Sequence, residues 1–458
     1  MKLTIFSTAV LLLSLVGWPL FANVLKIDGK RYIPLDTRSK IITKAILTEV
    51  GVPYREPTPP AEKPADPQAA KPDQAKYGEK KAAKGRAKKA TPDTRKKTKG
   101  SKEPPFFEGS GNDSLPKGEP EEFFSSDGDF FGEEGKKRDS EALDEYRRTR
   151  AEWEAEYRSA KKRWGREYRD TVREWEREKR EFLKRLPIYQ NNLVDVKIIG
   201  RKLAEGGTPA SDSETAKQPL RDYHLLPGIL EIPVRDQGRR GTCGAFAAVR
   251  AMEGVFIQHR LRADLSEQFF YWSSRPDCQK SACSRGGSWF GSGLVASRQA
   301  HSLDIPLESD CPYSPSTLAD NDTQTPLPLS CFRGAGKAVR FRQIKAERIV
   351  DSLHDNAPVL GALKLTQNFY KTPGLVTWQD AQKKPLIATK HRGHAVLIVG
   401  YAKLPAEKRP QEGEICYLAA NSWGRGWGKG GYACLTQRWL EKQGLSFIAL
   451  SRVEYRKP

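Results

Sequence analysis

After its first 25 residues, this chain of 458 residues has no apolar run long enough to cross a bilayer. That absence excludes a polytopic membrane protein. Hydrophobic residues make up only 38% of the chain, below the usual level of roughly 45–50%, so part of it is expected to lack a core. Seven cysteines are too few for a small disulfide scaffold, and their odd number leaves at least one without an intramolecular partner. They also lack the close paired spacing of a zinc site, so we expect no metal and no cofactor.

The start of the chain carries an export pattern. Met1-Lys2 gives a basic beginning, and the apolar run after it has a leucine-rich centre and ends at the small residue Ala22. This order is typical of a secretory signal peptide, so we expect residues 1–22 to be cleaved. A retained membrane anchor is the alternative, but Pro19 argues against it. Export predicts a secreted or periplasmic protein, in a compartment where cysteines can pair.

Composition divides the rest of the chain into five parts. Residues 23–53 predict a short hairpin and helix, too small to stand alone. Residues 54–138 contain Pro/Ala-rich, basic and acidic tracts that cannot form a core and should be disordered. The basic tract is interpreted as a solvated linker, and an exported chain is not expected to bind nucleic acid. Residues 139–188 predict a long charged helix, 189–222 a linker that includes the polar stretch 203–219, and 223–458 a globular domain large enough to house a site.

An eleven-residue repeat runs through the predicted helix, beginning EYRRTRAEWEA, EYRSAKKRWGR and EYRDTVREWER. Eleven residues in three turns give 3.67 per turn, so the repeated aromatic residues form one nearly straight stripe. The stripe consists of Tyr146, Tyr157, Tyr168, Trp153, Trp164 and Trp175. Ser140 is the expected N-cap, and Pro187 is expected to end the helix. Two interpretations stay open: a lone charged helix or weak coiled coil, and a pro-segment whose stripe docks on the downstream domain.

The chemistry-bearing residues begin with a glycine-broken loop that feeds an alanine-rich helix. Cys243 lies where this helix begins, and a helix N-terminus favours the thiolate, the reactive form of cysteine. Gln237 lies on the loop, close enough to fold its amide back beside Cys243. One side-chain N–H of Gln237 and the backbone N–H of Cys243 would together stabilise an oxyanion.

Further along, His394 opens an apolar run that predicts a buried strand with the imidazole at its mouth. Asn421 ends a second predicted strand, just before a glycine-rich turn. Its side chain can accept the second imidazole proton and hold the ring toward Cys243, and Trp423 can cover that hydrogen bond from water. A nucleophile, a base and an orienting group are therefore available.

At these residues the chain resembles the papain-like cysteine peptidases, the C1 family, over residues 223–458. The matching motifs are Gln237-Gly, Gly241-Thr-Cys243, Phe246-Ala, Leu265-Ser-Glu-Gln268, Gly286-Gly287, Cys311-Pro-Tyr313, Gly393-His394-Ala-Val and Asn421-Ser-Trp-Gly-x-Gly-Trp-Gly-x-x-Gly-Tyr432. The resemblance implies an α+β fold of two lobes with the active cleft between them. The helical lobe would be led by the helix from Cys243, and the β-rich lobe would carry His394 and Asn421.

The resemblance also implies the role of each matching residue. Cys243 would be the nucleophile, His394 the general base and then acid, and Asn421 the group that orients the imidazole. The remaining positions are Gln237 as oxyanion donor, Gly286, Gly287 and Gly393 along the bound peptide, and Trp423 as a shield. The expected reaction is hydrolysis of a peptide or protein substrate through a thioester.

Several positions depart from the family pattern. Arg240 stands where the family usually has a disulfide cysteine, and Gly244 replaces the aromatic residue after the nucleophile, which removes packing beside Cys243. The usual C-terminal disulfide cysteine and the common propeptide pattern are also absent. We therefore expect a divergent, bacterial branch of the family.

With Cys243 free, three disulfides are possible. Cys416 and Cys434 are expected to pair, because they lie on the two strands that flank the glycine turn. Cys278, Cys283, Cys311 and Cys331 cannot be assigned.

The predicted function is an exported cysteine endopeptidase made as a precursor, with residues from 23 to about 220 removed or held apart. One alternative is a catalytically inactive domain that binds peptides, motivated by Gly244. Another is an envelope protein that acts through its helix and charged tracts. The sequence carries no indication of an oligomeric state.

Overall fold

A computed structural model describes residues 25–27, 30–32, 35–54, 133–201, 203, 219–275, 287–299, 303–315, 327–383 and 392–455. The expected signal peptide (1–22), nearly all of the low-complexity region (54–138) and most of the polar stretch 203–219 lie outside these residues. So do Gly286, Cys278 and Cys283.

The chain forms two compact units, one of residues 1–58 and 164–458 and the other of residues 59–163. The described part of the second unit is the beginning of helix α2 (Glu133–Asn191). Here Trp153 stacks on Tyr157 with 5.5 Å between ring centroids. Arg150 Nε donates to Glu154 Oε1 at 3.1 Å. The repeat therefore supplies contacts at four-residue spacing within the helix itself.

Helix α2 is longer than the predicted 139–188. It begins at Glu133, before the expected N-cap Ser140, and continues through Pro187 to Asn191. Proline lacks the N–H that would bond one turn back, but this loss falls in the last helical turns. Leu186 and Tyr189 on either side are buried, and we attribute the continuation of the helix to their packing.

The first unit is built on one large mixed sheet. Its strands run in the order β5-β6-β12-β7-β9-β10-β11-β8, and the short strands β3 and β4 both pair with β9. The strands are β3 (Val194–Asp195), β4 (Tyr223–Leu225), β5 (Ile305–Pro306), β6 (Gly334–Ile344), β7 (Val359–Lys364), β8 (Leu375–Val376), β9 (Arg392–Lys403), β10 (Ile415–Ala420), β11 (Tyr432–Thr436) and β12 (Gly444–Tyr455). All but the ends of β9 is buried, as expected for an apolar strand in the middle of the sheet.

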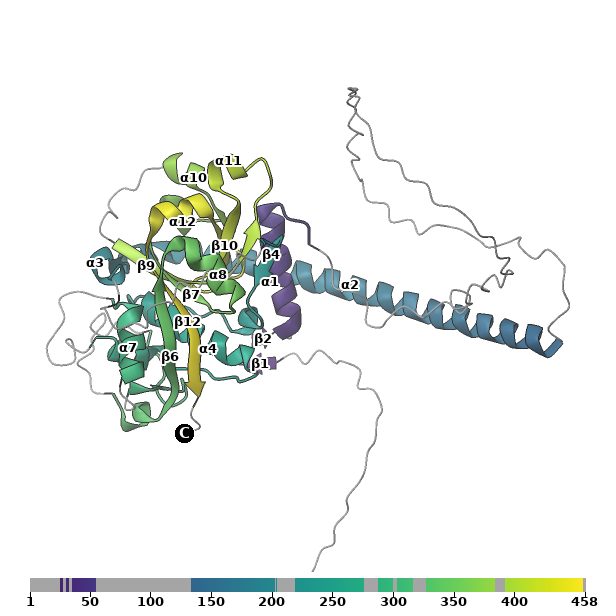
Figure 1. The fold of residues 1–458 in the computed structure, drawn as a ribbon, viewed down its shortest axis with the longest axis horizontal. Coiled ribbons are helices and arrows are strands. Elements are labelled where there is room, and N and C mark those ends of the chain that lie inside the picture. Colours follow the sequence, from purple (N-terminus) through teal and green to yellow (C-terminus); the bar gives the residue numbers. More distant parts are fainter. Residues whose placement is uncertain are drawn as a thin grey trace, which may run out of the picture. The chain divides into compact units, whose positions relative to one another are not determined.

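Helices gather in two groups around this sheet (Figure 1). Helices α4, α5 and α7 contact one another, and α10, α11 and α12 form a second group. The helices are α3 (Val196–Ile199), α4 (Cys243–Gln258), α5 (Glu267–Ser273), α7 (Phe290–Gln299), α8 (Ile349–His354), α9 (Gln367–Tyr370), α10 (Trp378–Lys383), α11 (Arg409–Glu412) and α12 (Gln437–Gln443), with 3-10 turns η1 (Ile229–Glu231), η3 (Leu329–Phe332) and η4 (Ala346–Arg348). Helix α4 packs against β9 and β12, and this packing places its first residue, Cys243, next to the sheet. The helices and the mixed sheet confirm the predicted α+β class.

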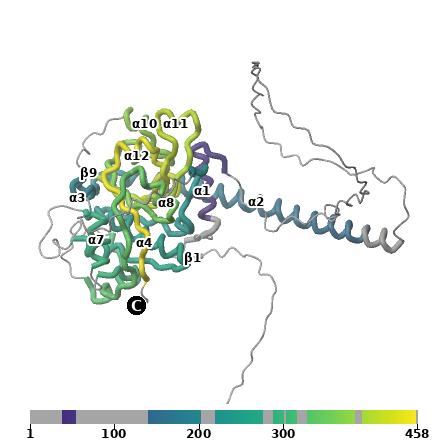
Figure 2. Tube along the Cα trace, viewed as in Figure 1, coloured from purple at the N-terminus to yellow at the C-terminus, as the bar shows by residue number. Residues whose placement is uncertain are grey.

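The N-terminal segment forms the hairpin and helix expected from residues 23–53. Strands β1 (Leu25–Ile27) and β2 (Lys30–Tyr32) are antiparallel and precede helix α1 (Leu35–Val50). One face of α1, coloured purple in Figure 2, packs on η1, β8 and β11. Its buried residues follow helical spacing: Ile41, Ile42, Ala45, Ile46, Leu47 and Val50. This helix is thus part of the first unit's core.

Two disulfides are present among the described residues. Cys416 and Cys434 join β10 to β11, as predicted. Cys311 pairs with Cys331, an assignment that the sequence left open. Cys243 is free. Among the described helices, none combines the length and the apolarity needed to cross a bilayer.

Candidate active site

Cys243 is the first residue of α4, and Thr242 is its N-cap. The glycine-broken loop before it leaves the extended path of residues 235–237 and turns into the helix. The Cys243 side chain is fully buried, at 0% exposure. Helix α4 is buried over most of its length, and its small residues, four alanines and two glycines of 16, let β9 and β12 approach.

His394 and Asn421 form a hydrogen-bonded pair. Nε2 of His394 lies 2.7 Å from Oδ1 of Asn421. The imidazole comes from the start of β9, and Asn421 directly follows β10, the antiparallel neighbour of β9. Nδ1 of His394 has no hydrogen-bond partner within the described residues. One ring nitrogen is therefore held by the amide, and the other remains for a second group.

The Cys243 thiol lies beside the backbone of residue Ala395, next to His394. Backbone N–H groups of Ala395, Gly244 and Cys243 itself favour the thiolate, but complete burial outweighs them and raises the pKa of the thiol to about 12. Burial likewise lowers the pKa of His394 to about 4, against the opposing bond to Asn421. The N–H groups at the helix N-terminus thus favour the thiolate as expected, and burial of the covered site opposes them.

Gln237 is fixed on three sides. Its backbone N–H donates to the carbonyl of Ser422 at 2.8 Å, and the Ser422 hydroxyl donates to Oε1 of Gln237 at 2.6 Å. Nε2 of Gln237 donates to the Arg240 carbonyl at 2.7 Å. An amide nitrogen carries two hydrogens, so this bond leaves the second for another acceptor.

Trp423 lies at the centre of an aromatic cluster. Its ring centroid is 4.4 Å from that of His394, and Tyr370 stacks on it at 5.7 Å with planes 10° apart. Phe369 meets it edge-on. The cluster covers the His394–Asn421 bond, and with only 2% of Trp423 exposed it keeps water from that side.

Gly244 does not leave a space beside Cys243. A Cβ added there would meet the backbone oxygen of Ser288 at 2.9 Å and the nitrogen of Phe290 at 3.4 Å. The expected loss of packing is therefore wrong: backbone fills the place of a side chain. The observation that motivated an inactive peptide-binding domain is accounted for by this close approach.

Gly244→Ala is consequently expected to destabilise the protein by about 1–3 kcal/mol, because a methyl group cannot fit without moving backbone. Gly165→Ala is the matched control, since the added Cβ on α2 would meet only the flexible end of Arg169 at 3.4 Å. Alanine should stabilise that helix by about 0.5–1 kcal/mol. Thermal unfolding of both variants measures the difference, and equal melting temperatures would contradict the close packing at Gly244.

Residues 189–201, which the sequence assigns to a linker, contain the end of α2, strand β3 and helix α3. Val194 is fully buried and pairs with Gly393 in the short β3–β9 ladder. A Cβ on Gly287 would lie 2.5 Å from Cγ1 of Val194, and one on Gly241 would lie 3.6 Å from the Asn192 carbonyl. This stretch therefore lies between glycines of the helical side and the strand that carries His394.

The end of α2 adds a second layer over the same region. Phe182 and Tyr189 stack on Trp423, with centroids 6.3 and 5.3 Å away. The Tyr189 hydroxyl donates to the Asp236 carboxylate at 2.9 Å. Arg425, two residues after Trp423, forms ion pairs with Glu174 and Glu178 of α2. Of the aromatic stripe, Trp175 is buried and lies against the glycine-rich turn after Asn421, since a Cβ on Gly430 would be 2.7 Å from its ring.

The structure brings together Cys243, His394, Asn421, Gln237 and Trp423, with Gly287 and Gly393 beside them; Gly286 lies outside the described residues. Sequence reasoning missed Val194, whose signal is the aliphatic run LVDVKII at residues 193–199. It also missed Ser422, visible only as the middle of the Asn-Ser-Trp motif. In the described part of the chain, no group of three His, Cys, Asp or Glu side chains is placed to hold a metal.

Comparison with known proteins identifies this region. Residues 228–447 match the family described as papain family cysteine protease. Over these residues the chain is similar to the papain-like cysteine peptidases. Ananain from Ananas comosus is 28% identical over 223 residues, which cover 47% of this chain and 56% of ananain. A cysteine protease from Blomia tropicalis is 26% identical over 237 residues, covering 48% and 64% of the two chains.

Among solved structures, the papain-like domain is similar to xylellain, a cysteine protease from Xylella fastidiosa, with a TM-score of 0.41 and 18% identity over 52% of this chain and 88% of that one. Digestive procathepsin L2 from Tenebrio molitor gives a TM-score of 0.43 and 22% identity over 56% and 78%. The chain spans about 56–64% of the length of the curated relatives named above. A bacterial branch stays a prediction.

Proposed function

We propose that this protein is an exported cysteine endopeptidase, made as a precursor, that hydrolyses peptide bonds through Cys243, His394 and Asn421. The observation that carries the proposal is the His394–Asn421 bond of 2.7 Å, which leaves Nδ1 free beside the backbone that meets the thiol. This is the arrangement that a nucleophile, a base and an orienting group require.

In the proposed reaction, Nδ1 of His394 accepts the proton of Cys243 as sulfur attacks the scissile carbonyl carbon. The oxyanion receives N–H bonds from the Cys243 backbone and from the second amide hydrogen of Gln237. His394 then returns the proton to the leaving amine, and a thioester remains. Water, deprotonated by His394, attacks the thioester and releases the acid and the thiol.

The proposed substrate is an extended peptide. The β3–β9 pairing shows that the edge of β9 at Gly393 accepts a strand from another part of the chain. On the opposite side, Gly287 adopts φ +89° and has no side chain to block a backbone. Gly286 is proposed to contribute in the same way. A polypeptide lying where residues 192–195 lie would pass beside Cys243.

Because residues 192–195 already occupy this place, we propose that α2 and the residues after it act as an intramolecular pro-segment. Val194 is 0% exposed, so no second polypeptide can use the position while the segment remains. Activity then requires that the segment be cut or displaced. The two disulfides fit secretion or a periplasmic location, since such bonds persist in oxidising compartments.

The test is to incubate the purified full-length protein with a denatured protein and to sequence all new peptides by mass spectrometry. We expect cuts in the added protein and cuts in the chain itself before Tyr223. Iodoacetamide added during the incubation should stop both. If neither polypeptide is cut, even after a second protease has removed the segment before Tyr223, the proposed activity is wrong.

A further inference from the structure

The loop that carries Gln237 is held by a residue that the resemblance marks only as a departure. Arg240 lies three residues before Cys243, at the position where the family usually has a disulfide cysteine. We infer that Arg240 is a positioning residue: its guanidinium clamps the oxyanion loop by noncovalent contacts where a disulfide is missing. This inference rests on the proposed peptidase activity.

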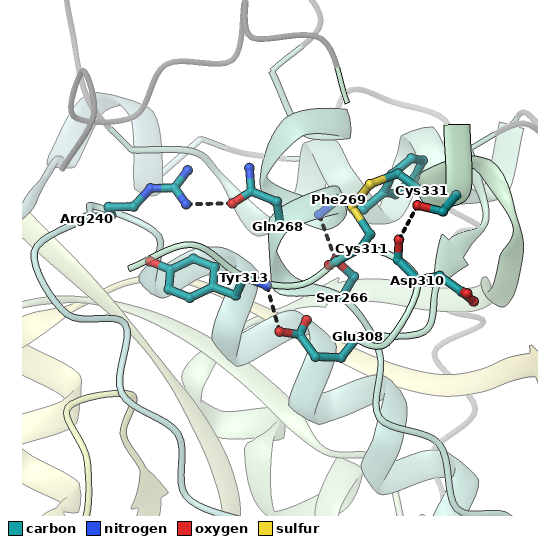
Figure 3. Close-up of a disulfide and its surroundings, with 10 residues drawn as sticks. Arg240, Ser266, Gln268, Phe269, Glu308, Asp310, Cys311, Tyr313 and Cys331 are labelled. Carbon is teal, nitrogen blue, oxygen red and sulfur yellow. Dashed lines mark hydrogen bonds between the residues drawn. A yellow bond between two sulfur atoms is a disulfide. The ribbon is translucent and has the colours of Figure 1, made fainter. Parts of the chain in front are cut away.

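The guanidinium reaches two other elements of the helical side. Nη1 of Arg240 donates to Oε1 of Gln268 at 2.6 Å and to the Ser314 carbonyl at 2.9 Å. Gln268 belongs to α5, and Ser314 lies in the chain after the Cys311–Cys331 disulfide. Figure 3 shows the Arg240–Gln268 bond, with the Tyr313 ring beside the same side chain. Arg240 is only 5% exposed, so these bonds are shielded from solvent competition.

Two aromatic rings complete the clamp. The guanidinium carbon of Arg240 lies 5.2 Å from the ring centroid of Tyr271 and 5.0 Å from that of Tyr313. A planar, delocalised cation can stack on rings while its N–H groups bind acceptors at the edge. Lysine can supply the positive charge, but its ammonium group has neither the planar shape that stacks on a ring nor the forked N–H donors of a guanidinium.

The clamp acts on Gln237 by two routes. The Arg240 carbonyl accepts the bond from Nε2 of Gln237 at 2.7 Å, which sets the direction of the amide. The Tyr313 hydroxyl donates to the Gln237 carbonyl at 2.7 Å and lies 2.9 Å from Oγ1 of Thr242, the N-cap of α4. Both the amide and the residue before the nucleophile are thus tied to groups that Arg240 holds.

The partner side of the clamp is itself rigid. The backbone N–H of Tyr313 donates to Oε1 of Glu308 at 2.6 Å. Ser266, the N-cap of α5, donates from its hydroxyl to the Cys311 carbonyl. The disulfide to Cys331 fixes the same stretch (Figure 3). Arg240 therefore ties the loop that carries Gln237 to a segment of the chain that these bonds hold in place.

An oxyanion donor acts when charge develops in the transition state, so misplacing it lowers kcat and leaves KM nearly unchanged. Loss of one such donor costs about 100–1,000-fold in kcat. Arg240→Ala keeps Gln237 but loosens it, and we expect kcat to fall about 10–100-fold with KM within about twofold. Arg240→Lys should fold and still lose about three- to tenfold in kcat, since it retains only the charge.

The decisive experiment combines these variants with Gln237→Ala in the full-length protein, after incubation until the wild type reaches constant activity against a dye-quenched denatured protein. Active sites are counted by alkylation of Cys243. If Arg240 works through Gln237, Arg240→Ala should cost less than about twofold in kcat when Gln237 is already alanine. A merely structural role would give the same loss in both backgrounds.

Arg275→Ala is the matched control, because Arg275 is another buried arginine on a ring of the clamp. Its guanidinium carbon lies 5.3 Å from the ring centroid of Tyr271. It should lower the melting temperature and leave kcat within about twofold. Full kcat in both Arg240 variants, or additive losses with Gln237→Ala, overturns the inference while the activity stands. A wild type that cuts nothing overturns the proposed function and, with it, this inference.

Discussion

Cys243→Ala is expected to lower kcat/KM for a denatured protein by about 10,000-fold or more, to the limit of detection. The variant loses the sulfur that forms the proposed thioester, and no second free thiol is present among the described residues. His394→Ala should have an effect of similar size, because the base and the acid of the reaction are removed together. The measurement is the rate of peptide release per mole of processed protein.

Two controls make this result specific. His259→Ala removes an exposed histidine at the C-cap of the same helix that begins with Cys243, and its activity should equal that of the wild type. Asn421→Ala should weaken the activity without abolishing it, since the imidazole keeps its chemistry and loses its orientation. Retained hydrolysis in Cys243→Ala, with a cut pattern like that of the wild type, would contradict the proposed mechanism.

Displacing the pro-segment is expected to make Cys243 at least about a hundredfold more reactive toward iodoacetamide at pH 7. A thiol whose pKa is about 12 is almost entirely protonated at that pH, whereas an ordinary cysteine, with a pKa of about 8.5, has a few per cent thiolate. Restoring the ordinary pKa raises the thiolate fraction by about 3,000-fold. A more acidic thiol is also a weaker nucleophile once ionised, which lowers the alkylation rate by about 30-fold. The net gain in rate is then about a hundredfold, and the exposure of the sulfur to the reagent adds to it.

Val194→Asp is the variant that displaces the segment, because it would bury a carboxylate against Gly287 at a fully covered position. Lys197→Asp introduces the same side chain at an exposed position of the same segment and should leave the labelling rate unchanged. Peptide mass spectrometry assigns the label to Cys243. Below pH 12 the covered thiol should also react about tenfold faster for each unit of added pH. Equal labelling rates in Val194→Asp and the wild type would show that the segment does not control the thiol.

The bonded pair of His394 and Asn421 could be predicted from local patterns. An apolar run with histidine at its start and a strand that ends before a glycine-rich turn specify two neighbouring strands, and antiparallel pairing brings their ends together. The same reasoning gave the Cys416–Cys434 disulfide. Each prediction needed only a short stretch of chain and the geometry of one sheet.

The covering of the site could not be predicted in this way. Val194 lies in the short aliphatic run LVDVKII, and its partner Gly393 lies about two hundred positions later, so no local periodicity links them. Burial also outweighs the effect of the helix N-terminus on Cys243, and the chain that buries this residue comes from distant segments. Arg240 shows the same limit, because its acceptors and rings come from two separate parts of the chain, residues 268–271 and 313–314.

Helix α1 is expected to stay bound to the rest of the first unit if the chain is cut after it. Its apolar face lies in the core of the first unit, and Glu49 is 3.2 Å from Lys429 on the turn after β10. Only the stretch between Tyr54 and Glu133 joins this helix to α2 along the chain. A cut in that stretch is therefore expected to yield two polypeptides that co-elute in size-exclusion chromatography and separate in denaturing detergent. The smaller fragment would then be a noncovalently bound subunit.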